Sequence, residues 1–289
     1  MAEASKMLQP ALARTVRGRD GLVMPAFGLG TWRMGESKSR RAAEVAALKL
    51  GLDQGVRLID TAEMYGDGAA ETIVAEAAQG RRDEVFIVSK VMPHNASRAG
   101  AIRAAEASLA RLMTDRIDLY LLHWRGSHPL EETLEAFVRL KHEGKIRHFG
   151  VSNFDTEAMA GALLGRHGAA VASNQVMYNL ARRGIETRLL PWCAKPDVVV
   201  MAYSPLDRGQ LAASKGLRAV ASRHGVTPEA IAIAWTMRLP HLVTIPKATS
   251  PTHVHADLAA ARISLTPDDL AVLDADYPPP EGDVPLDIE

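Results

Sequence analysis

A carboxylic acid and a phenol lie close together in the segment 58–66, where Asp60 and Tyr65 are five residues apart. Apolar residues directly precede Asp60, and glycine and aspartate follow Tyr65, which predicts a short buried strand ending at Asp60 and a loop containing Tyr65. A carboxylate at the end of a strand with a phenol beside it suits acid–base chemistry at the mouth of a barrel. Taken alone, the pair is also consistent with a turn-forming aspartate and a packed tyrosine.

Polar or aromatic residues follow the other predicted strands in the same way. Together with Asp60 they are Trp32, Lys90, His123, Ser152, Asn153, Asn174, Gln175, Tyr203, Ser204 and Lys247. In a closed parallel barrel, the carboxyl ends of all strands open on one face, and that face holds the active site. A single member, such as His123 or Lys90, could be a hydrogen-bonded core residue. The whole set favours a functional site at this face.

The elements that must position these residues alternate along the chain. Strands are predicted at 26–30, 57–60, 85–88, 117–122, 147–151, 171–173, 198–202 and 242–245, with Ser89, Lys90, Asn174 and Gln175 just beyond strand ends. Helices are predicted at 41–54, 69–79 and 130–144, among others, and Asp155, Thr227, Ser250 and Thr266 are predicted to cap later helices. The alternation predicts one parallel barrel rather than a doubly wound sheet.

The predicted architecture is an α/β fold, a (β/α)8 TIM barrel over residues 14–289, preceded by a loose tail over residues 1–13. A hairpin at 16–24, with Asp20 and Gly21 at its turn, is expected to cap the bottom of the barrel. A doubly wound fold needs a glycine-rich phosphate fingerprint after its first strand. Gly28-Leu29-Gly30 begins like one, but the third glycine is missing and the chain continues into Trp32.

Composition narrows the class of protein. The chain has 289 residues, 47% of them hydrophobic, with 34 basic and 34 acidic residues and no net charge, which argues against nucleic-acid or anionic-membrane partners. The single cysteine, Cys193, excludes an internal disulfide and fits a reducing cytosol. The N-terminus has no signal-peptide pattern, and no apolar stretch reaches about 18 residues. We therefore expect a soluble, cytoplasmic protein.

Several blocks of the sequence resemble the signature blocks of the aldo-keto reductases, in order and from about residue 15 to the end of the chain. The blocks are Asp60 to Gly66, Ser89-Lys90, Leu121 to Trp124, Gly150 to Phe154, Asn174 to Asn179, Ala202 to Leu206 and Ile245 to Lys247. The segment 124–127 and the brief C-terminal tail are similar to the bacterial members that reduce methylglyoxal and related aldehydes.

The resemblance implies a mechanism. A hydride passes from the nicotinamide of NADPH to a carbonyl carbon while Tyr65 protonates the oxygen. An unperturbed phenol has a pKa of roughly 10, and the ammonium of Lys90 is expected to lower it. Asp60 is expected to hold Lys90 charged and oriented, and His123 to hydrogen-bond the substrate carbonyl. No metal is expected, because Lys is a poor ligand and no His-x-x-x-His pattern is present.

The resemblance also implies a set of cofactor contacts. They are Thr31, Asp60, Ser152, Asn153, Gln175, Tyr203, Ser204, Pro205, Leu206, Lys247, Ala248, Thr249 and His253. Lys247 matches the pocket for the 2′-phosphate of adenosine, which favours NADPH, with NADH as a weaker alternative. Two departures predict a modest preference: His253 replaces an arginine of many relatives, and Ala256-Asp257 replaces Glu-Asn against the adenine.

Trp32, Met92 and Trp124 are expected to wall the substrate pocket together with His123, because each flanks a catalytic strand end. The chain stops soon after Pro280, which predicts an open pocket and broad tolerance for small aldehydes and ketones. A monomer is expected. Two alternatives stay open from the residues: an NADPH-binding regulatory subunit with little turnover, and a Schiff-base aldolase that uses Lys90.

Overall fold

The computed structural model describes residues 12–211 and 214–288. Of the expected N-terminal tail, residues 1–11 lie outside the described part, whereas Leu12 is buried in the core. The chain then forms an antiparallel hairpin of β1 (Thr15–Arg17) and β2 (Val23–Pro25). Its turn contains Asp20 at φ 58° and Gly21 at φ 69°, as expected for the primed turn types of tight hairpins. The predicted hairpin is confirmed.

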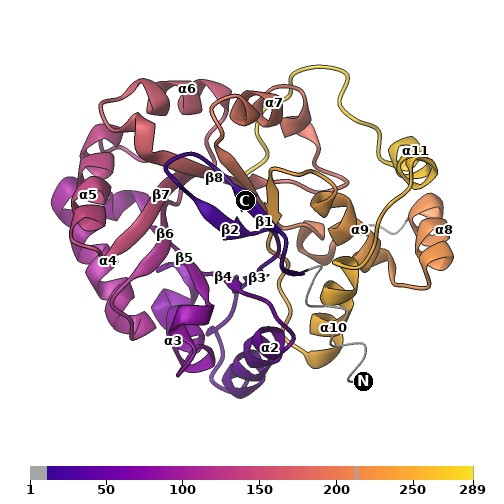
Figure 1. The fold of residues 1–289 in the computed structure, drawn as a ribbon, viewed down its shortest axis with the longest axis horizontal. Helices are drawn as coiled ribbons and strands as arrows, with labels where there is room; N and C mark the ends of the chain where they lie inside the picture. The colour runs from indigo at the N-terminus through magenta and orange to yellow at the C-terminus, as the bar shows by residue number, and fades with distance from the viewer. Residues whose placement is uncertain (1–11, 212–213, 289) are drawn as a thin grey trace.

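Eight parallel strands follow, in the spatial order β10-β9-β8-β7-β6-β5-β4-β3 (Figure 1). They are β3 (Leu29–Gly30), β4 (Leu58–Asp60), β5 (Phe86–Val91), β6 (Ile117–Leu122), β7 (Ile146–Ser152), β8 (Val171–Met177), β9 (Val199–Tyr203) and β10 (Leu242–Thr244). The two edges meet, since the Gly28 N–H donates to the Thr244 carbonyl at 2.9 Å and the Thr244 N–H donates to the Ala26 carbonyl at 3.0 Å. The predicted barrel is therefore confirmed.

Helices surround the sheet (Figure 1). They are α2 (Arg41–Asp53), α3 (Ala69–Ala77), α4 (Arg98–Leu112), α5 (Leu130–His142), α6 (Thr156–Leu164), α7 (Leu189–Ala194), α8 (Lys215–His224), α9 (Pro228–Met237), α10 (Pro251–Ala260) and α11 (Pro267–Asp276). Asp155, Thr227, Ser250 and Thr266 each accept a hydrogen bond from the backbone N–H three residues on, so the four predicted caps are present. No helix in the described part is long and apolar enough to cross a membrane.

Two strands run well past the ends that the sequence pattern predicts, and β7 and β9 each end one residue later than predicted, at Ser152 and Tyr203. β5 continues through Ser89 and Lys90 to Val91, and β8 continues through Gln175 to Met177. The prediction that these polar residues lie beyond the strand ends is therefore wrong. The strands extend because each buried polar side chain has a partner there: Lys90 is paired with Asp60, and Gln175 donates to the same carboxylate.

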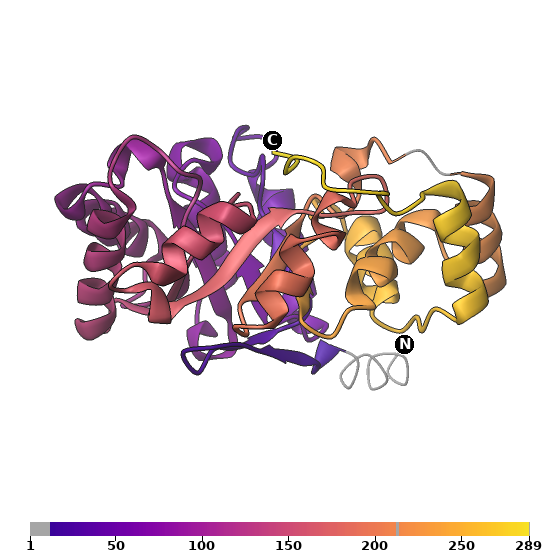
Figure 2. The same cartoon turned by 90° about the horizontal axis from the view of Figure 1, so that it is seen from above.

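The hairpin closes one end of the barrel. Its side chains Val16, Leu22 and Met24 belong to the same buried cluster as inward-facing strand residues such as Val88 and Leu119. In Figure 2 the indigo hairpin lies along one face of the barrel and the C-terminal segment along the opposite face. This arrangement confirms the expected capping of the barrel bottom and leaves the carboxyl ends of the strands for the site.

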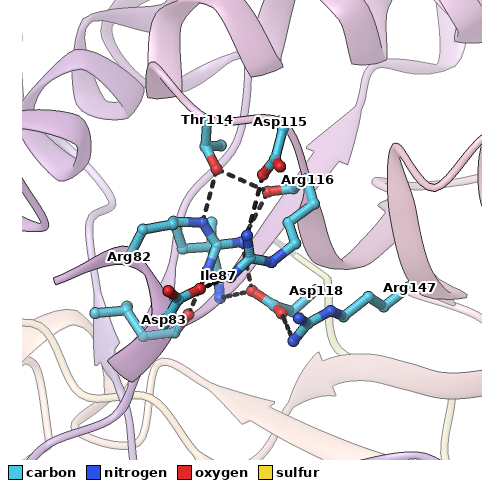
Figure 3. Close-up of polar contacts among 9 residues, drawn as sticks. Arg82, Asp83, Ile87, Thr114, Asp115, Arg116, Asp118 and Arg147 are labelled. Carbon is cyan, nitrogen blue, oxygen red and sulfur yellow. Dashed lines mark hydrogen bonds and ion pairs between the residues drawn. The ribbon is translucent and has the colours of Figure 1, made fainter.

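An ion network joins three strands near their amino ends (Figure 3). The carboxylate of Asp118, which is 1% exposed, accepts hydrogen bonds from Arg82 at 2.7 Å and Arg147 at 2.8 Å. It also accepts one from the backbone N–H of Ile87 at 2.9 Å. Asp118 lies on β6, Ile87 on β5 and Arg147 on β7, so one buried carboxylate links the three neighbouring strands at their amino ends.

Candidate active site

The carboxyl ends of the strands surround a cavity of about 630 Å³, which is within the usual range for ligand sites. Its lining includes most of the residues that the sequence singled out. These are Trp32, Asp60, Tyr65, His123, Trp124, Ser152, Asn153, Gln175, Tyr203, Ser204, Pro205, Leu206, Lys247 and His253. Lys90 lies just beneath this surface and is completely buried.

Lys90 is held by three acceptors. Its ammonium nitrogen is 2.7 Å from Asp60 Oδ2, 2.8 Å from the carbonyl oxygen of Thr61 and 3.2 Å from the hydroxyl oxygen of Tyr65. An ammonium has three hydrogens, so these contacts use its full donor capacity. Burial lowers the pKa of Lys90, and the charge and hydrogen bond of Asp60 oppose that lowering.

Asp60 is fixed by a second contact on its other oxygen. The side-chain amide of Gln175 on β8 donates to Asp60 Oδ1 at 2.7 Å. The carbonyl of Asp60 also accepts from the backbone and the hydroxyl of Thr31, both at 3.0 Å. With both oxygens occupied, the carboxylate has one orientation in which to face the Lys90 ammonium.

Tyr65 begins a short 3-10 segment, η1 (Tyr65–Gly68), that turns the chain into α3. Gly66, Asp67 and Gly68 have φ of 56°, 52° and 85° in this turn. A side chain at Gly66 would place its Cβ 2.9 Å from the carbonyl oxygen of Met34, so this close approach requires glycine. The ring of Trp32 meets the Tyr65 ring edge-on, with centroids 5.0 Å apart. The Tyr65 hydroxyl is thereby directed at Lys90.

His123 follows β6 and is 7% exposed, with its ring centroid 5.7 Å from that of Tyr65. Burial, followed by the nearby charge of Lys90, lowers the pKa of His123 to about 2. The imidazole is therefore neutral at physiological pH. Its Nδ1 has no hydrogen-bond partner among the described residues. A neutral imidazole at this place can donate a hydrogen bond to a ligand in the cavity without contributing a proton to it.

The low pKa of His123 makes stability depend on pH. An unfolded histidine binds a proton below about pH 6.5, whereas folded His123 stays neutral, so the free energy of unfolding falls as pH drops from 6.5. We expect this fall between pH 7 and pH 5 to be about 1–2 kcal/mol smaller in His123→Gln than in the wild type, measured by urea denaturation. An equal fall in both proteins would contradict a neutral His123 in the folded state.

A group of amides and hydroxyls borders the cavity beside His123. The Tyr203 hydroxyl donates to Asn153 Oδ1 at 2.9 Å, and the Asn153 amide donates to the carbonyl of His123 at 3.1 Å. The Ser152 hydroxyl donates to the carbonyl of Gln175 at 2.8 Å. Asn153 has φ of 60°, a left-handed conformation that is uncommon outside glycine and concentrates at functional sites. The arrangement presents fixed donors and acceptors suited to an amide group.

The far end of the cavity is electropositive on one side. Lys247 lines it close to the N-terminus of α10, where helix geometry favours an anion. Desolvation lowers the pKa of Lys247, the charges of Glu44 and Glu36 oppose the lowering, and those of Arg40 and Arg33 add to it. The ammonium of Lys247 beside the start of a helix is a suitable partner for a phosphate group.

Besides Lys90, four residues that were predicted to contact the cofactor or substrate do not line the cavity. Thr31 is buried and bonded to Asp60, Ala248 is buried, and Met92 and Thr249 are not among the lining residues. The cavity lining also includes residues that were not predicted to contact a ligand, among them Met64, Arg208 and Glu229, and it includes Asp257, which the resemblance placed against the adenine. Met64 and Arg208 adjoin predicted motifs and could have been inferred from them, whereas nothing in its local pattern singles out Glu229.

Among the residues that line the cavity, Asp257 is unusual as a titratable group. It is 3% exposed, and its Oδ2 has no partner among the described residues. Burial, followed by the charge of Glu229, raises the pKa of Asp257 to about 8. Cys193, by contrast, lies outside the cavity lining, and burial raises its pKa to about 12, in keeping with a structural rather than a nucleophilic thiol.

Residues 26–277 match the Aldo/keto reductase family. The chain belongs to this family. The family assignment confirms the resemblance noted in the sequence, and with it the prediction of an NADP-dependent oxidoreductase. Asp60, Tyr65, Lys90 and His123, which are far apart in the sequence, come together at the cavity.

Several aldo-keto reductases are similar over nearly the whole chain. Methylglyoxal reductase YeaE of Escherichia coli (strain K12) is 47% identical over 270 residues, covering 92% of this chain and 95% of the relative. Methylglyoxal reductase DkgB of Escherichia coli O157:H7 is 29% identical over 91% of this chain and 99% of the relative. An aldo/keto reductase from Klebsiella pneumoniae in complex with NADP and acetate has a TM-score of 0.92 at 48% identity, covering 96% of this chain and 99% of that one.

Proposed function

We propose that this aldo-keto reductase reduces aldehydes and small ketones of the methylglyoxal kind to alcohols, with NADPH as its cofactor. The observation on which the proposal depends is the contact of 3.2 Å between the Tyr65 hydroxyl and the Lys90 ammonium at the base of the cavity. The similarity to two methylglyoxal reductases and to a protein crystallised with NADP supports the substrate class and the cofactor.

Tyr65 is the proton donor in this proposal. As negative charge develops on the carbonyl oxygen, the phenol O–H transfers its proton to that oxygen, and the Lys90 ammonium stabilises the phenolate that remains. Asp60, 2.7 Å from Lys90, keeps the ammonium oriented toward Tyr65. The pair is buried from water, which strengthens these electrostatic interactions relative to solution.

His123 positions the substrate. Because its imidazole is neutral, it donates a hydrogen bond to the carbonyl oxygen and does not compete with Tyr65 as an acid. The side chains of Trp32, Met64 and Trp124 also line this end of the cavity and provide apolar walls. No residue of the described C-terminal segment beyond Asp257 lines the cavity, which supports broad tolerance for small carbonyl compounds.

The cavity fits a dinucleotide by the chemistry of its donors. Asn153, Gln175 and Ser152 offer amide and hydroxyl groups at one end, and Lys247 with the start of α10 offers a phosphate site at the other. The reduced nicotinamide, when bound, supplies the hydride. Tyr203, Ser204, Pro205 and Leu206 also line the cavity.

The geometry disfavours a Schiff-base aldolase. Attack on a carbonyl needs an uncharged and accessible amine. Lys90 is 0% exposed, and all three of its hydrogens are engaged with Asp60, Thr61 and Tyr65. A regulatory subunit that only binds NADPH has the same residues, so turnover is the property that separates it from a reductase.

Turnover is tested by following the NADPH absorption band with methylglyoxal, small sugars and other aldehydes, and with NADH in parallel. The proposal predicts loss of NADPH that depends on the aldehyde and gives stoichiometric alcohol. Tight NADPH binding with no aldehyde-dependent oxidation across the panel would favour the regulatory alternative.

Lys247→Ala tests the phosphate end of the cavity. Loss of this ammonium should raise the KM for NADPH by about 10-fold to 100-fold and change the KM for NADH by less than about twofold, because only NADPH has the 2′-phosphate. His253→Ala is the matched comparison, and a smaller effect is expected because an imidazole lacks the permanent charge of an ammonium. Equal effects of Lys247→Ala on the two cofactors would count against the phosphate contact.

A further inference from the structure

One buried carboxylate near the catalytic pair is not part of the cavity wall. Glu71 lies in the first turn of α3 and is 0% exposed. The proposed chemistry does not use it, and its local sequence predicts only a helix. Burying a charged carboxylate is costly unless it is paired and hydrogen-bonded, so its contacts indicate what it does.

Both oxygens of Glu71 have strong partners. The hydroxyl of Ser89 on β5 donates to Glu71 Oε1 at 2.6 Å, and Arg111 Nε on α4 donates to Glu71 Oε2 at 2.6 Å. The Arg111 guanidinium is itself held, since it also donates to the hydroxyl of Ser108 at 3.1 Å. Glu71 therefore ties the N-terminus of α3 to β5 on one side and to α4 on the other.

The contacts of Glu71 lie on the outer side of the barrel wall, next to the segments that contain Tyr65 and Lys90. Ser89 directly precedes Lys90, and the alternation of a strand points the Ser89 side chain to the outside of the barrel and that of Lys90 to the inside. α3 begins four residues after Tyr65, through the left-handed turn at 66–68. The space beside Gly68 is filled by the Arg111 side chain, because a Cβ there would lie 2.5 Å from Arg111 Cδ. The turn after Tyr65 is therefore packed on the same arginine that binds Glu71.

The charge of Glu71 also acts on the pair. Its carboxylate favours the charged form of Lys90, adding to the effect of Asp60. The charged or titratable groups that act on Lys90 are Asp60 from β4, Tyr65 from η1, His123 after β6 and Glu71 from α3. Around Glu71 itself are Arg111 from α4, Lys90 from β5 and Tyr120 from β6.

We propose that Glu71 is a positioning residue that holds the Tyr65 hydroxyl at the Lys90 ammonium, by fastening the helix after Tyr65 to the strand that contains Lys90. The inference rests on the proposed function, because the pair is useful only if Tyr65 transfers a proton. Glu71 touches neither substrate nor cofactor, so it is expected to affect kcat rather than cofactor binding.

Two variants separate its contacts from its charge. Glu71→Gln removes the charge and keeps an amide oxygen for Ser89, whereas Ser89→Ala removes the link to β5 and keeps the charge. Both should lower kcat for methylglyoxal by about tenfold, because small displacements of reacting groups have large effects on rate. The Kd for NADPH, measured by fluorescence titration, should stay within about twofold of the wild type.

The pH profile gives a readout that a purely structural role would not move. Removing an anion makes loss of a proton from its neighbours easier, so in Glu71→Gln the alkaline limb of kcat for reduction should move to lower pH by about 0.5–1 unit. In Ser89→Ala the limb should stay in place. Asp118→Asn is the control, since it alters another buried carboxylate bound to arginine at the opposite end of the barrel and should lower stability without changing the profile.

A second measurement does not depend on turnover. Tyrosine ionisation is followed by absorbance as pH rises, in the wild type and in Tyr65→Phe. Subtracting the second curve from the first isolates the ionisation of Tyr65 among the five tyrosines. The same subtraction for Glu71→Gln with and without Tyr65→Phe should show that Tyr65 ionises at lower pH than in the wild type. A wild type that oxidises NADPH while both variants keep their kcat would overturn the inference and leave the reductase proposal intact. A wild type without turnover would overturn the reductase proposal. In that case, Tyr65 ionising at the same pH in the wild type and in Glu71→Gln would also overturn the positioning role of Glu71.

Discussion

Tyr65→Phe is expected to lower kcat for methylglyoxal by about 10²-fold to 10⁴-fold, the range measured when a positioned general acid is lost. The substitution removes one oxygen atom, which is the atom 3.2 Å from the Lys90 ammonium. The ring can keep its edge-on contact with Trp32 at 5.0 Å, so the cavity should keep its shape. The expected loss therefore comes from proton transfer and not from collapse of the site.

The measurement is the rate of NADPH oxidation at saturating aldehyde, together with the Kd for NADPH by fluorescence. The Kd should change by less than about threefold, because the hydroxyl acts on the transition state rather than on cofactor binding. Tyr178→Phe is a matched control: its hydroxyl is also buried but bonds Glu186 away from the cavity lining, and the rate should hardly change. If Tyr65→Phe oxidises NADPH at a rate near that of the wild type, Tyr65 is not the proton donor.

The barrel was predictable from the sequence because its pattern repeats. Apolar strands alternate with helices that begin at strong caps such as Thr227 and Thr266, and both signals are local. Two helices were missed. α7 is only six residues long and contains Pro191, so its pattern is weak. α8 does show a usable signal, since Ser214 caps it and Leu217 and Val220 lie on its buried face.

The four residues with proposed catalytic roles were predictable as candidates for a different reason. Asp60 and His123 are polar residues at the ends of apolar strands, and the topology of a parallel barrel brings such residues together whatever their separation in sequence. Lys90 shows the limit of that argument. It lies within β5 and not after it, because its partner Asp60 makes a buried ammonium tolerable, and that pairing depends on two strands meeting in space.

Contacts between distant residues that leave no local pattern could not be predicted. Glu71 is bound by Arg111, which is 40 residues away, and Asp118 is bound by Arg82, which is 36 residues away. In the sequence, each carboxylate looks like an ordinary polar residue of a helix or a strand start. Only the fold shows that both carboxylates are buried and paired, so neither contact could be predicted from the sequence.

Asp118→Ala is expected to lower the free energy of unfolding by about 2–4 kcal/mol, because it leaves buried donors without their acceptor. The backbone N–H of Ile87 loses its partner at 2.9 Å, and Arg82 loses one at 2.7 Å. Arg147 loses little, since its side chain is 54% exposed and water can replace the carboxylate. Because Arg147 is partly exposed, the expected loss of unfolding free energy is smaller than that for breaking a fully buried ion pair.

Urea denaturation gives the free energy, and a thermal scan should show a midpoint lower by roughly 2–4 °C for each kcal/mol. Asp83→Ala is the control in the same network, because Asp83 pairs with Arg116 at the surface and its side chain is 93% exposed, so no measurable change is expected. The folded Asp118→Ala protein should keep the wild-type KM for NADPH, since the network lies at the amino ends of the strands. Equal stability of the two variants would show that Asp118 does not hold β5, β6 and β7 together, because its three contacts would then contribute no more than one exposed ion pair.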